Sequence, residues 1–269
     1  MARIIAIANQ KGGVAKTTTS INLAASLSLM KQRILLVDLD PQGSATVGSG
    51  VNKQELTNTI NEVLLGDCDA ESAIVKTRWG FSLLPSNGDL TVAEVRLLKS
   101  DNRDRCLANA LNVLSAAYDY ILIDCPPSLN MLTVNGLVAA HSVLVPIQCE
   151  YYALEGLTSL LASIERIKQA VNPQLKIEGL LRTMYDGRNR LTSEVSEQLL
   201  THFRGQVYHT VIPRNVRLAE APSHGIPVVH YDKRSQGAIA YLALASEFLQ
   251  RYRKSERRVP QDQAVREEV

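Results

Sequence analysis

The sequence predicts an α/β fold with a single doubly wound, mostly parallel sheet flanked by helices. Short apolar runs alternate with segments of helical periodicity, a glycine-containing turn joins the first run to the first helix, and several runs end in aspartate. The chain has 269 residues, of which 45% are hydrophobic and 21% charged. This length and composition support one large core and exclude a disordered, collagenous or low-complexity chain.

The first elements form a βαβ unit. A strand is expected at residues 3–8, a turn at 9–15, a helix from 16 to about 30 and a second strand at 34–37. Farther along, the pattern predicts strands at 120–123, 142–146, 176–184 and 207–212, and helices at 153–170, 191–202 and 235–253. We therefore expect one domain over residues 1–253, followed by a polar, disordered tail over residues 254–269.

Composition also argues against several classes of protein. No stretch approaches the ~20 apolar residues of a membrane span, and the N-terminus lacks the pattern of a signal peptide. The four cysteines show no CxxC spacing, which argues against a zinc site or a disulfide framework and for reduced thiols in a cytoplasm. They are Cys68, Cys106, Cys125 and Cys149.

Charge is distributed unevenly around a net value of +2. Residues 1–159 hold 12 Lys and Arg against 15 Asp and Glu, a balance of −3. Residues 160–269 hold 17 against 12, a balance of +5. An acidic first part and a basic second part suggest two different partners, and nucleic acid is one candidate for the basic part.

A phosphate-binding loop is expected between the first strand and the first helix, where the sequence reads Lys11-Gly-Gly-Val-Ala-Lys-Thr-Thr18. Gly12 and Gly13 have no Cβ, so the backbone can turn its N–H groups toward an anion. Lys16 opens the helix and can reach the β- and γ-phosphates, and the Thr17 hydroxyl suits Mg²⁺. A plain glycine turn would explain the glycines but not the Lys-Thr pair.

The loop departs from the standard pattern G-x-x-x-x-G-K-[ST] at both fixed glycines, where Gln10 and Ala15 stand. Lys11 followed by two glycines marks the deviant Walker A class, which explains the first departure. That class normally has glycine at the position of Ala15 as well. A Cβ there is expected to lie close to the phosphates, weakening nucleotide binding or straining the backbone.

Two further strands end in aspartate. Asp38 and Asp40 follow the strand at 34–37, and Asp124 follows the strand at 120–123 in the position of a Walker B carboxylate. Ligands of open α/β sheets bind outside the carboxyl ends of the strands, so these side chains should converge beside the phosphate loop. A lone aspartate at a strand end is usually a cap or a turn former, but three together favour metal and water roles.

With these motifs the sequence resembles the ParA/Soj chromosome-partitioning ATPases. The resemblance runs from about residue 3 to 253 and is carried by the phosphate loop and four further motifs. These motifs are Val37-Asp-Leu-Asp-Pro-Gln-Gly43, Ile123-Asp-Cys-Pro-Pro-Ser128, Gln148-Cys-Glu-Tyr-Tyr-Ala-Leu-Glu-Gly156 and Val211-Ile-Pro-Arg-Asn-Val-Arg-Leu-Ala-Glu-Ala-Pro-Ser223. The loop alone also fits MinD and the nitrogenase iron proteins, whereas the last two motifs are more specific.

The resemblance implies a cytoplasmic, nucleoid-associated ATPase that works with Mg²⁺ and either ATP or ADP. In the ATP state two copies would form a sandwich dimer in which Lys11 of each reaches the other's phosphates. That dimer would bind double-stranded DNA without sequence preference, and a ParB-type partner would stimulate hydrolysis and release it. The first strand begins at residue 3, so no N-terminal helix-turn-helix domain and no operator-specific binding are expected.

The resemblance also assigns roles by position. Lys11, Lys16 and Asp40 would be catalytic, with Asp40 assisting the attack of water, while Thr17, Asp38, Asp40 and Asp124 would serve the metal. The nucleotide would be bound by Lys11, Gly12, Gly13, Val14, Ala15, Lys16, Thr17, Thr18, Met184, Pro213, Arg214 and Asn215, of which Met184 and 213–215 lie where the family holds adenine.

DNA binding is assigned to six cations in the basic second part of the chain. These side chains would contact DNA phosphates independently of the base sequence. They are Arg188, Arg190, Arg214, Arg217, Lys233 and Arg234. The alternative for these side chains is a solvated surface or intramolecular ion pairs, for example Arg217 with Glu220.

Three other functions remain open. A MinD-like ATPase that cycles on membranes would need an amphipathic C-terminal helix, and after Tyr252 the tail has too few apolar residues for one. An electron-transfer ATPase resembling the nitrogenase iron protein would need cluster ligands, for which Cys125 and Cys149 are the candidates, although buried inert thiols explain them better. A DNA-coating protein in which Ala15 has abolished turnover is the third.

Overall fold

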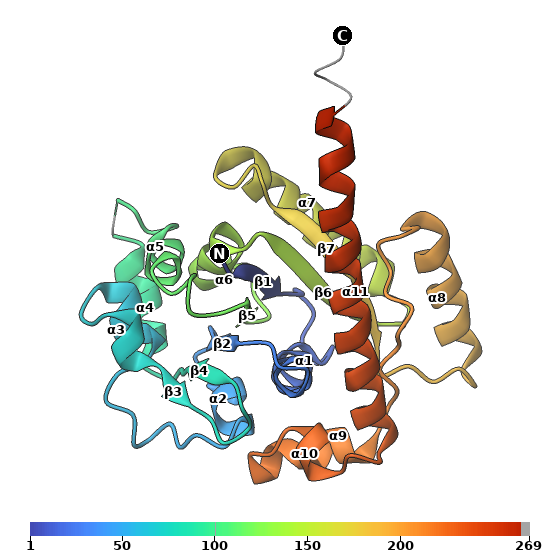
Figure 1. The fold of residues 1–269 in the computed structure, drawn as a ribbon, viewed down its shortest axis with the longest axis horizontal. Coiled ribbons are helices and arrows are strands. Elements are labelled where there is room, and N and C mark those ends of the chain that lie inside the picture. Colours follow the sequence, from blue (N-terminus) through green and yellow to red (C-terminus); the bar gives the residue numbers. More distant parts are fainter. Residues whose placement is uncertain (100, 265–269) are drawn as a thin grey trace.

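The sheet has seven strands in the order β3-β4-β2-β5-β1-β6-β7, and the computed structural model describes residues 1–99 and 101–264, with side chains up to residue 253 (Figure 1). The strands are β1 (Arg3–Ile7), β2 (Ile34–Asp38), β3 (Val75–Lys76), β4 (Ser82–Leu84), β5 (Tyr120–Asp124), β6 (Ser142–Gln148) and β7 (Lys176–Thr183). All neighbours pair in parallel except β3 and β4, which are antiparallel. The doubly wound, mostly parallel sheet is confirmed.

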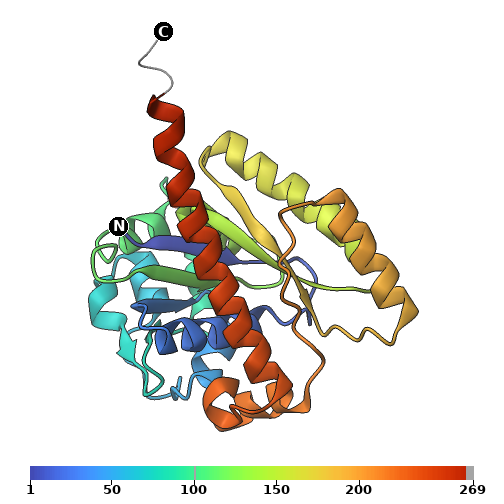
Figure 2. The same ribbon diagram turned by 45° about the vertical axis from the view of Figure 1, so that its right-hand side comes forward.

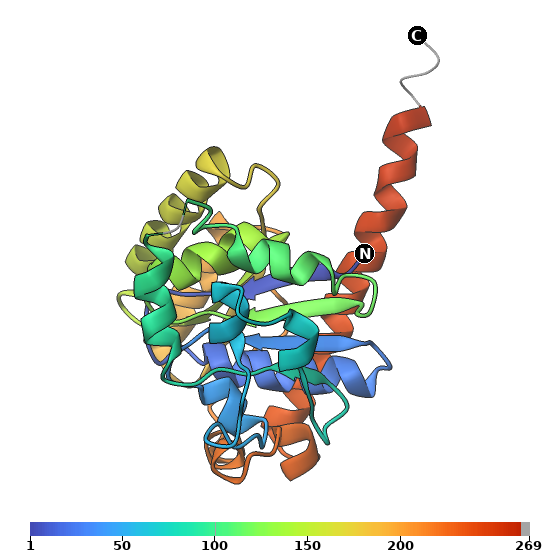
Figure 3. The same cartoon turned by 90° about the vertical axis from the view of Figure 1, so that its left-hand side faces the viewer.

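Both faces of the sheet are buried, as a parallel sheet requires. Along β1, Ile4 and Ala6 face one core, whereas Ile5 and Ile7 face the other. The helices α1 (Lys16–Leu29) and α11 (Gln236–Ala264) pack on the face of Ile5 and Ile7. The opposite face is covered by α3 (Ile60–Leu65), α4 (Leu90–Leu97), α5 (Cys106–Asn112), α6 (Met131–Ala139), α7 (Ala153–Ala170) and α8 (Arg190–His202), as Figure 3 shows from the side.

The short elements complete the sheet edge and the loops. They are α2 (Ser44–Gly48), α9 (Val216–Glu220), α10 (Val228–Tyr231) and two 3₁₀ turns, η1 (Ala70–Ala73) and η2 (Ala221–His224). Each of these elements has too few apolar positions to show a helical period, so the sequence pattern predicted none of them. Local polar side chains still define some of the longer helices: Asn130 accepts from Thr133 N at the start of α6, and Asn189 accepts from Leu191 N at the start of α8.

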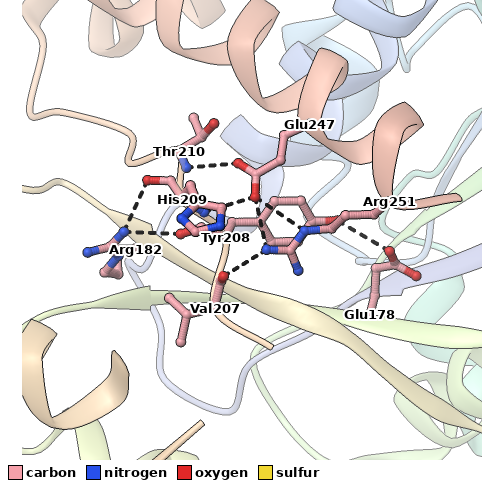
Figure 4. Close-up of polar contacts among 8 residues, drawn as sticks. All are labelled: Glu178, Arg182, Val207, Tyr208, His209, Thr210, Glu247 and Arg251. Carbon is pink, nitrogen blue, oxygen red and sulfur yellow. Dashed lines mark hydrogen bonds and ion pairs between the residues drawn. The ribbon is translucent and has the colours of Figure 1, made fainter. Parts of the chain in front are cut away.

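The strand expected at 207–212 is wrong. The segment runs beside β7 and the residues after it, with isolated parallel bridges at Val207 and Pro213 and backbone hydrogen bonds such as Tyr208 N to Leu180 O and Ile212 N to Arg182 O. Between the bridges, side chains interrupt the pairing (Figure 4). Glu247 of α11 accepts from His209 N at 2.9 Å and Thr210 N at 2.8 Å, so these two backbone donors bond to a carboxylate and no continuous ladder forms.

Arg182 of β7 and Arg251 of α11 satisfy carbonyls of the same segment. Arg182 donates to Tyr208 O and His209 O, and Arg251 donates to Val207 O at 2.7 Å (Figure 4). A guanidinium offers five donors in a fixed fork, which suits several carbonyls at once. The segment at 207–212 therefore pairs with β7 only in part and does not form a continuous strand.

The last helix is longer than expected. The sequence placed its end at residue 253, whereas α11 continues to Ala264, and Figures 1 and 2 show it crossing the sheet and extending beyond the rest of the domain. The first part of the expected disordered tail is thus helical, and residues 265–269 lie outside the described residues. Among the described helices, none combines the length and the apolar character that crossing a bilayer requires.

Candidate functional site

The loop between β1 and α1 is tied to β6 and β7 by side-chain hydrogen bonds. Asn9 donates to Pro146 O at 2.7 Å and accepts from Lys11 N at 3.0 Å, and Thr183 donates to Val14 O at 3.0 Å. A Cβ built on Gly12 or Gly13 would meet nothing within 4 Å, so the loop opens onto free space at both glycines. The loop is therefore a preformed cradle with room for an anion above it.

Ala15 adopts the left-handed conformation, with φ 66° and ψ 34°, immediately before α1. Gly13 has φ 73°. For a residue with a Cβ, this conformation costs about 1–2 kcal/mol, which is why glycine is the favoured residue here. The departure from the usual glycine thus places a strained backbone at the end of the loop.

Lys16 and Thr17 lie at the start of α1, next to Asp124 at the end of β5. Thr17 and Ser20 both donate to the Asp124 carboxylate, at 2.8 and 2.7 Å. The Lys16 ammonium donates to Lys11 O at 3.1 Å, so it lies folded over the loop. Burial lowers the pKa of Lys16, partly offset by the negative charge of Asp124.

Asp38 and Asp124 are register partners on β2 and β5, and both are fully buried. Burial raises the pKa of Asp38 to about 6, against hydrogen bonds from Thr46 N and Oγ1 that lower it. Burial, and then the charge of Asp38, raises the pKa of Asp124 to about 7. Two neighbouring carboxylates with raised pKa values would be relieved by a cation at this edge.

Asp40 lies just beyond β2 in a tight turn. Its carboxylate accepts from Gln42 N at 2.9 Å, its carbonyl accepts from Ser86 Oγ at 2.8 Å, and its N–H donates to Asp38 Oδ1 at 3.3 Å. Within the residues that the structure describes, no three His, Cys, Asp or Glu side chains form a metal site. A cation here would accordingly rely on hydroxyl, carboxylate, phosphate and water oxygens, the ligands of Mg²⁺.

A cavity of about 150 Å³ adjoins the C-terminal side of the loop. It brings together six residues of the expected nucleotide set, namely Ala15, Thr18, Met184, Pro213, Arg214 and Asn215. Its remaining lining comes from Ile212, Leu218, Ala219 and Tyr241. Three larger cavities, of about 290, 650 and 910 Å³, lie away from the loop, so size does not identify the site.

Asn215, one of the residues that line the cavity, carries an orphaned acceptor. Its Oδ1 is buried and has no hydrogen-bond partner among the described residues. A buried, unpaired carbonyl oxygen costs about 1–3 kcal/mol, so the position favours a ligand that brings a donor. An apolar wall with one free acceptor fits a flat heterocycle that carries an amino group.

Lys11 forms an ion pair that the sequence did not predict. Its ammonium lies 3.0 Å from Glu150 Oε2, and Gln148 donates to the other carboxylate oxygen of Glu150. Glu150 belongs to the motif at 148–156, which the sequence singled out without giving this residue a role. Its position could have identified Glu150 as a partner of Lys11, because an acidic residue just before α7 lies at the same edge of the sheet as the loop.

The six expected DNA-binding cations are all exposed, but three of them are already in ion pairs. Arg188 pairs with Asp186 at 2.8 Å and Arg190 with Glu194 at 2.7 Å. The third, Arg217, lies 2.7 Å from Glu220 and 3.4 Å from Asp232. These are the intramolecular pairs that the alternative interpretation required. With the four acids counted, the group of six cations carries a net charge of +2.

The two cysteines considered as cluster ligands are both buried. Burial raises the pKa of Cys125 above the range of thiols in water and that of Cys149 to about 11. Metal ligation requires a thiolate, so this environment opposes it. The geometry fits the interpretation of these residues as buried thiols.

Comparison with known proteins agrees with the geometry. The AAA domain family matches residues 2–177. An uncharacterised protein of Pseudomonas putida is 60% identical over 258 residues, covering 96% of this chain and 98% of that protein. The chromosome partitioning protein ParA of Myxococcus xanthus is 52% identical, covering 93% and 88%, and the sporulation initiation inhibitor protein Soj of Bacillus subtilis is 50% identical, covering 92% and 98%.

Solved structures give the same picture. A Mycobacterium smegmatis protein described as cobyrinic acid a,c-diamide synthase, with bound ADP and magnesium, has a TM-score of 0.84 at 41% identity and covers 95% of this chain and 97% of its own. The cell division ATPase MinD of Pyrococcus furiosus has a TM-score of 0.78 at 29% identity, covering 93% and 99%.

Proposed function

The chain belongs to the ParA/Soj family of chromosome-partitioning ATPases, and on that premise we propose that it is an ATP-driven partitioning protein. Its relatives are P-loop ATPases, and solved neighbours hold adenine nucleotides and magnesium. The observation that carries the proposal is the loop itself, with Lys11 and Lys16 on one cradle and the Thr17–Asp124 pair at its edge.

In this proposal the nucleotide lies across the loop. Lys16 and the loop amides from Gly12 to Thr18 bind the phosphates, and Met184, Pro213, Arg214 and Asn215 enclose the base. The orphaned Asn215 Oδ1 supports adenine, because the exocyclic amino group of adenine supplies the missing donor, whereas guanine presents a carbonyl there.

The residues around Asp124 fit a magnesium site. Thr17 would hold the ion, with Asp38 and Asp124 behind it, and Mg²⁺ would neutralise charge on the β- and γ-phosphate oxygens. Asp40, whose turn leaves one carboxylate oxygen outside the Gln42 hydrogen bond, would orient the attacking water. Lys16 would stabilise the charge that develops as the terminal phosphate leaves.

The rest of the cycle is proposed from the family. Two copies would close over the nucleotides, with Lys11 of each at the interface. The ATP-bound dimer would bind double-stranded DNA without sequence preference, which would place it on the nucleoid in the cytoplasm. A ParB-type partner would stimulate hydrolysis and release the dimer. The six cations from Arg188 to Arg234 are the candidate DNA contacts, because exposed ion pairs are worth only about 0.2–1 kcal/mol and exchange readily for phosphates.

The test is ATP turnover by the purified chain with Mg²⁺, alone and with added double-stranded DNA and the ParB-type protein of the same source. We expect slow turnover that the two additions together accelerate, and no turnover in Asp40→Ala at unchanged fold. Turnover that persists in Asp40→Ala would remove this residue from the reaction, and turnover that neither addition accelerates would contradict the partitioning cycle.

A further inference from the structure

The ion pair between Lys11 and Glu150 joins the phosphate loop to the turn between β6 and α7. The two atoms lie 3.0 Å apart, and both side chains are partly exposed, 38% for Lys11 and 48% for Glu150. The pair therefore lies at the surface, at the mouth of the site and not within its core. A second molecule approaching this edge would meet both charges.

Hydrogen bonds from neighbouring residues hold the backbone of each partner in place. Asn9 fixes the Lys11 N–H at 3.0 Å, and the Glu150 N–H donates to Gln148 O at 2.9 Å. The side chain of Gln148 donates to the Glu150 oxygen that Lys11 does not use. Glu150 is thus oriented toward the loop by a neighbour that carries no charge, and only Lys11 neutralises it among the contacts that the structure describes.

We propose that Glu150 is a positioning residue that holds Lys11 within its own chain and competes for it with the nucleotide of a second copy. The proposal rests on the function proposed above, in which Lys11 serves the partner's phosphates. One ammonium cannot neutralise the Glu150 carboxylate and a polyphosphate together, so closing the dimer must break this pair twice. Breaking the ion pair adds a free-energy cost to dimer closure. A triphosphate carries more charge than a diphosphate and therefore offsets this cost more readily.

The free-energy cost of breaking the Lys11–Glu150 pair should be small because the pair is exposed. Pairs of this exposure change an equilibrium only a few-fold, and two of them open for each dimer formed. Removing the carboxylate should therefore tighten the dimer by roughly two- to 25-fold, most at low salt. The effect should appear in the dimer equilibrium and leave nucleotide binding to a single copy unchanged.

The experiment is sedimentation of the full chain with Mg²⁺ and a non-hydrolysable ATP analogue, for wild type, Glu150→Gln and Glu150→Ala, at low and high salt. Glu155→Gln is the matched control, because Glu155 is an exposed acid in the first turn of α7 and its change removes the same charge a few residues away. Affinity for a fluorescent ATP analogue at concentrations where the protein is monomeric gives the second readout.

The expected result is a tighter dimer for both Glu150 variants, converging on wild type at high salt, with Glu155→Gln unchanged. A dimer that is equally tight or weaker in the Glu150 variants would overturn the proposal, and a weaker one would show that Glu150 supports the closed dimer. Failure of the wild type to dimerise with the analogue, while it still binds the analogue, would overturn the proposed cycle instead, so the two failures are distinct.

Discussion

At the residue scale, Ala15 is the feature that most affects the site. Its left-handed backbone carries strain that glycine would not. We expect Ala15→Gly to raise the free energy of unfolding by about 1 kcal/mol, the left-handed cost less the greater entropy that glycine loses on folding. It should also tighten nucleotide binding, since the Cβ borders the loop and the adjoining cavity. Chemical denaturation and calorimetry check both, and a less stable glycine variant would contradict the strain.

Asn215 makes a second prediction at this scale. If its orphaned Oδ1 accepts from an adenine amino group, Asn215→Leu should lose about tenfold or more in ATP affinity, as expected when a buried acceptor is lost. GTP affinity should change less, so the ratio of ATP affinity to GTP affinity should fall. Competition binding with both nucleotides measures it, and an equal loss for ATP and GTP would mean that the acceptor does not read the base.

At the scale of elements, the contact between α11 and the segment at 207–210 interrupts the pairing of that segment with β7. Glu247 accepts two backbone N–H groups of that segment and pairs with Arg251 at 2.9 Å. We expect Glu247→Gln to lower the free energy of unfolding by about 1–3 kcal/mol, the cost of weakening hydrogen bonds to a charged group. Nucleotide affinity should be nearly unchanged, because these residues lie outside the cavity at Ala15.

The same carboxylate gives a pH dependence. Burial acts to raise the pKa of Glu247, but the hydrogen bonds from Thr210, His209 and Arg251 outweigh it, and the pKa is lowered. A lowered folded-state pKa stabilises the fold above the unfolded value of about 4.3 and ceases to do so as the pH falls through the folded value. The stability gap between wild type and Glu247→Gln should hold at pH 7 and shrink below about pH 4. A gap that widens in acid would contradict this account.

Sequence periodicity worked where it reports burial and failed where side chains interrupt backbone pairing. The strands β1, β2, β5 and β6 are mainly apolar runs buried on both faces, so their sequences predict them directly. Segment 207–212 is also partly apolar, but the N–H groups of His209 and Thr210 bond to Glu247, which no local pattern reveals. Of the candidate site, the loop and the aspartates follow from motifs, whereas the Lys11–Glu150 pair joins residues 139 positions apart.

At the scale of the whole molecule, the proposed DNA binding would depend on the six exposed cations from Arg188 to Arg234. Arg217→Ala should weaken binding by a similar factor for all DNA sequences and reduce the salt dependence, because it removes a phosphate contact and no base contact. Arg33→Ala is the matched control, since Arg33 is also exposed and ion-paired, with Asp119 at 2.7 Å, but lies at the opposite end of the strands. Equal effects of the two changes would show that only net charge matters.

The whole proposed cycle requires that the loop between β1 and α1 binds Mg²⁺ and ATP. Calorimetric titration of Mg·ATP into this chain, Ala15→Gly and Lys16→Ala tests it most directly. We expect one saturable site per chain, tighter binding by the glycine variant and loss of binding in Lys16→Ala. Absence of binding in both this chain and the glycine variant, or undiminished binding in Lys16→Ala, would contradict it.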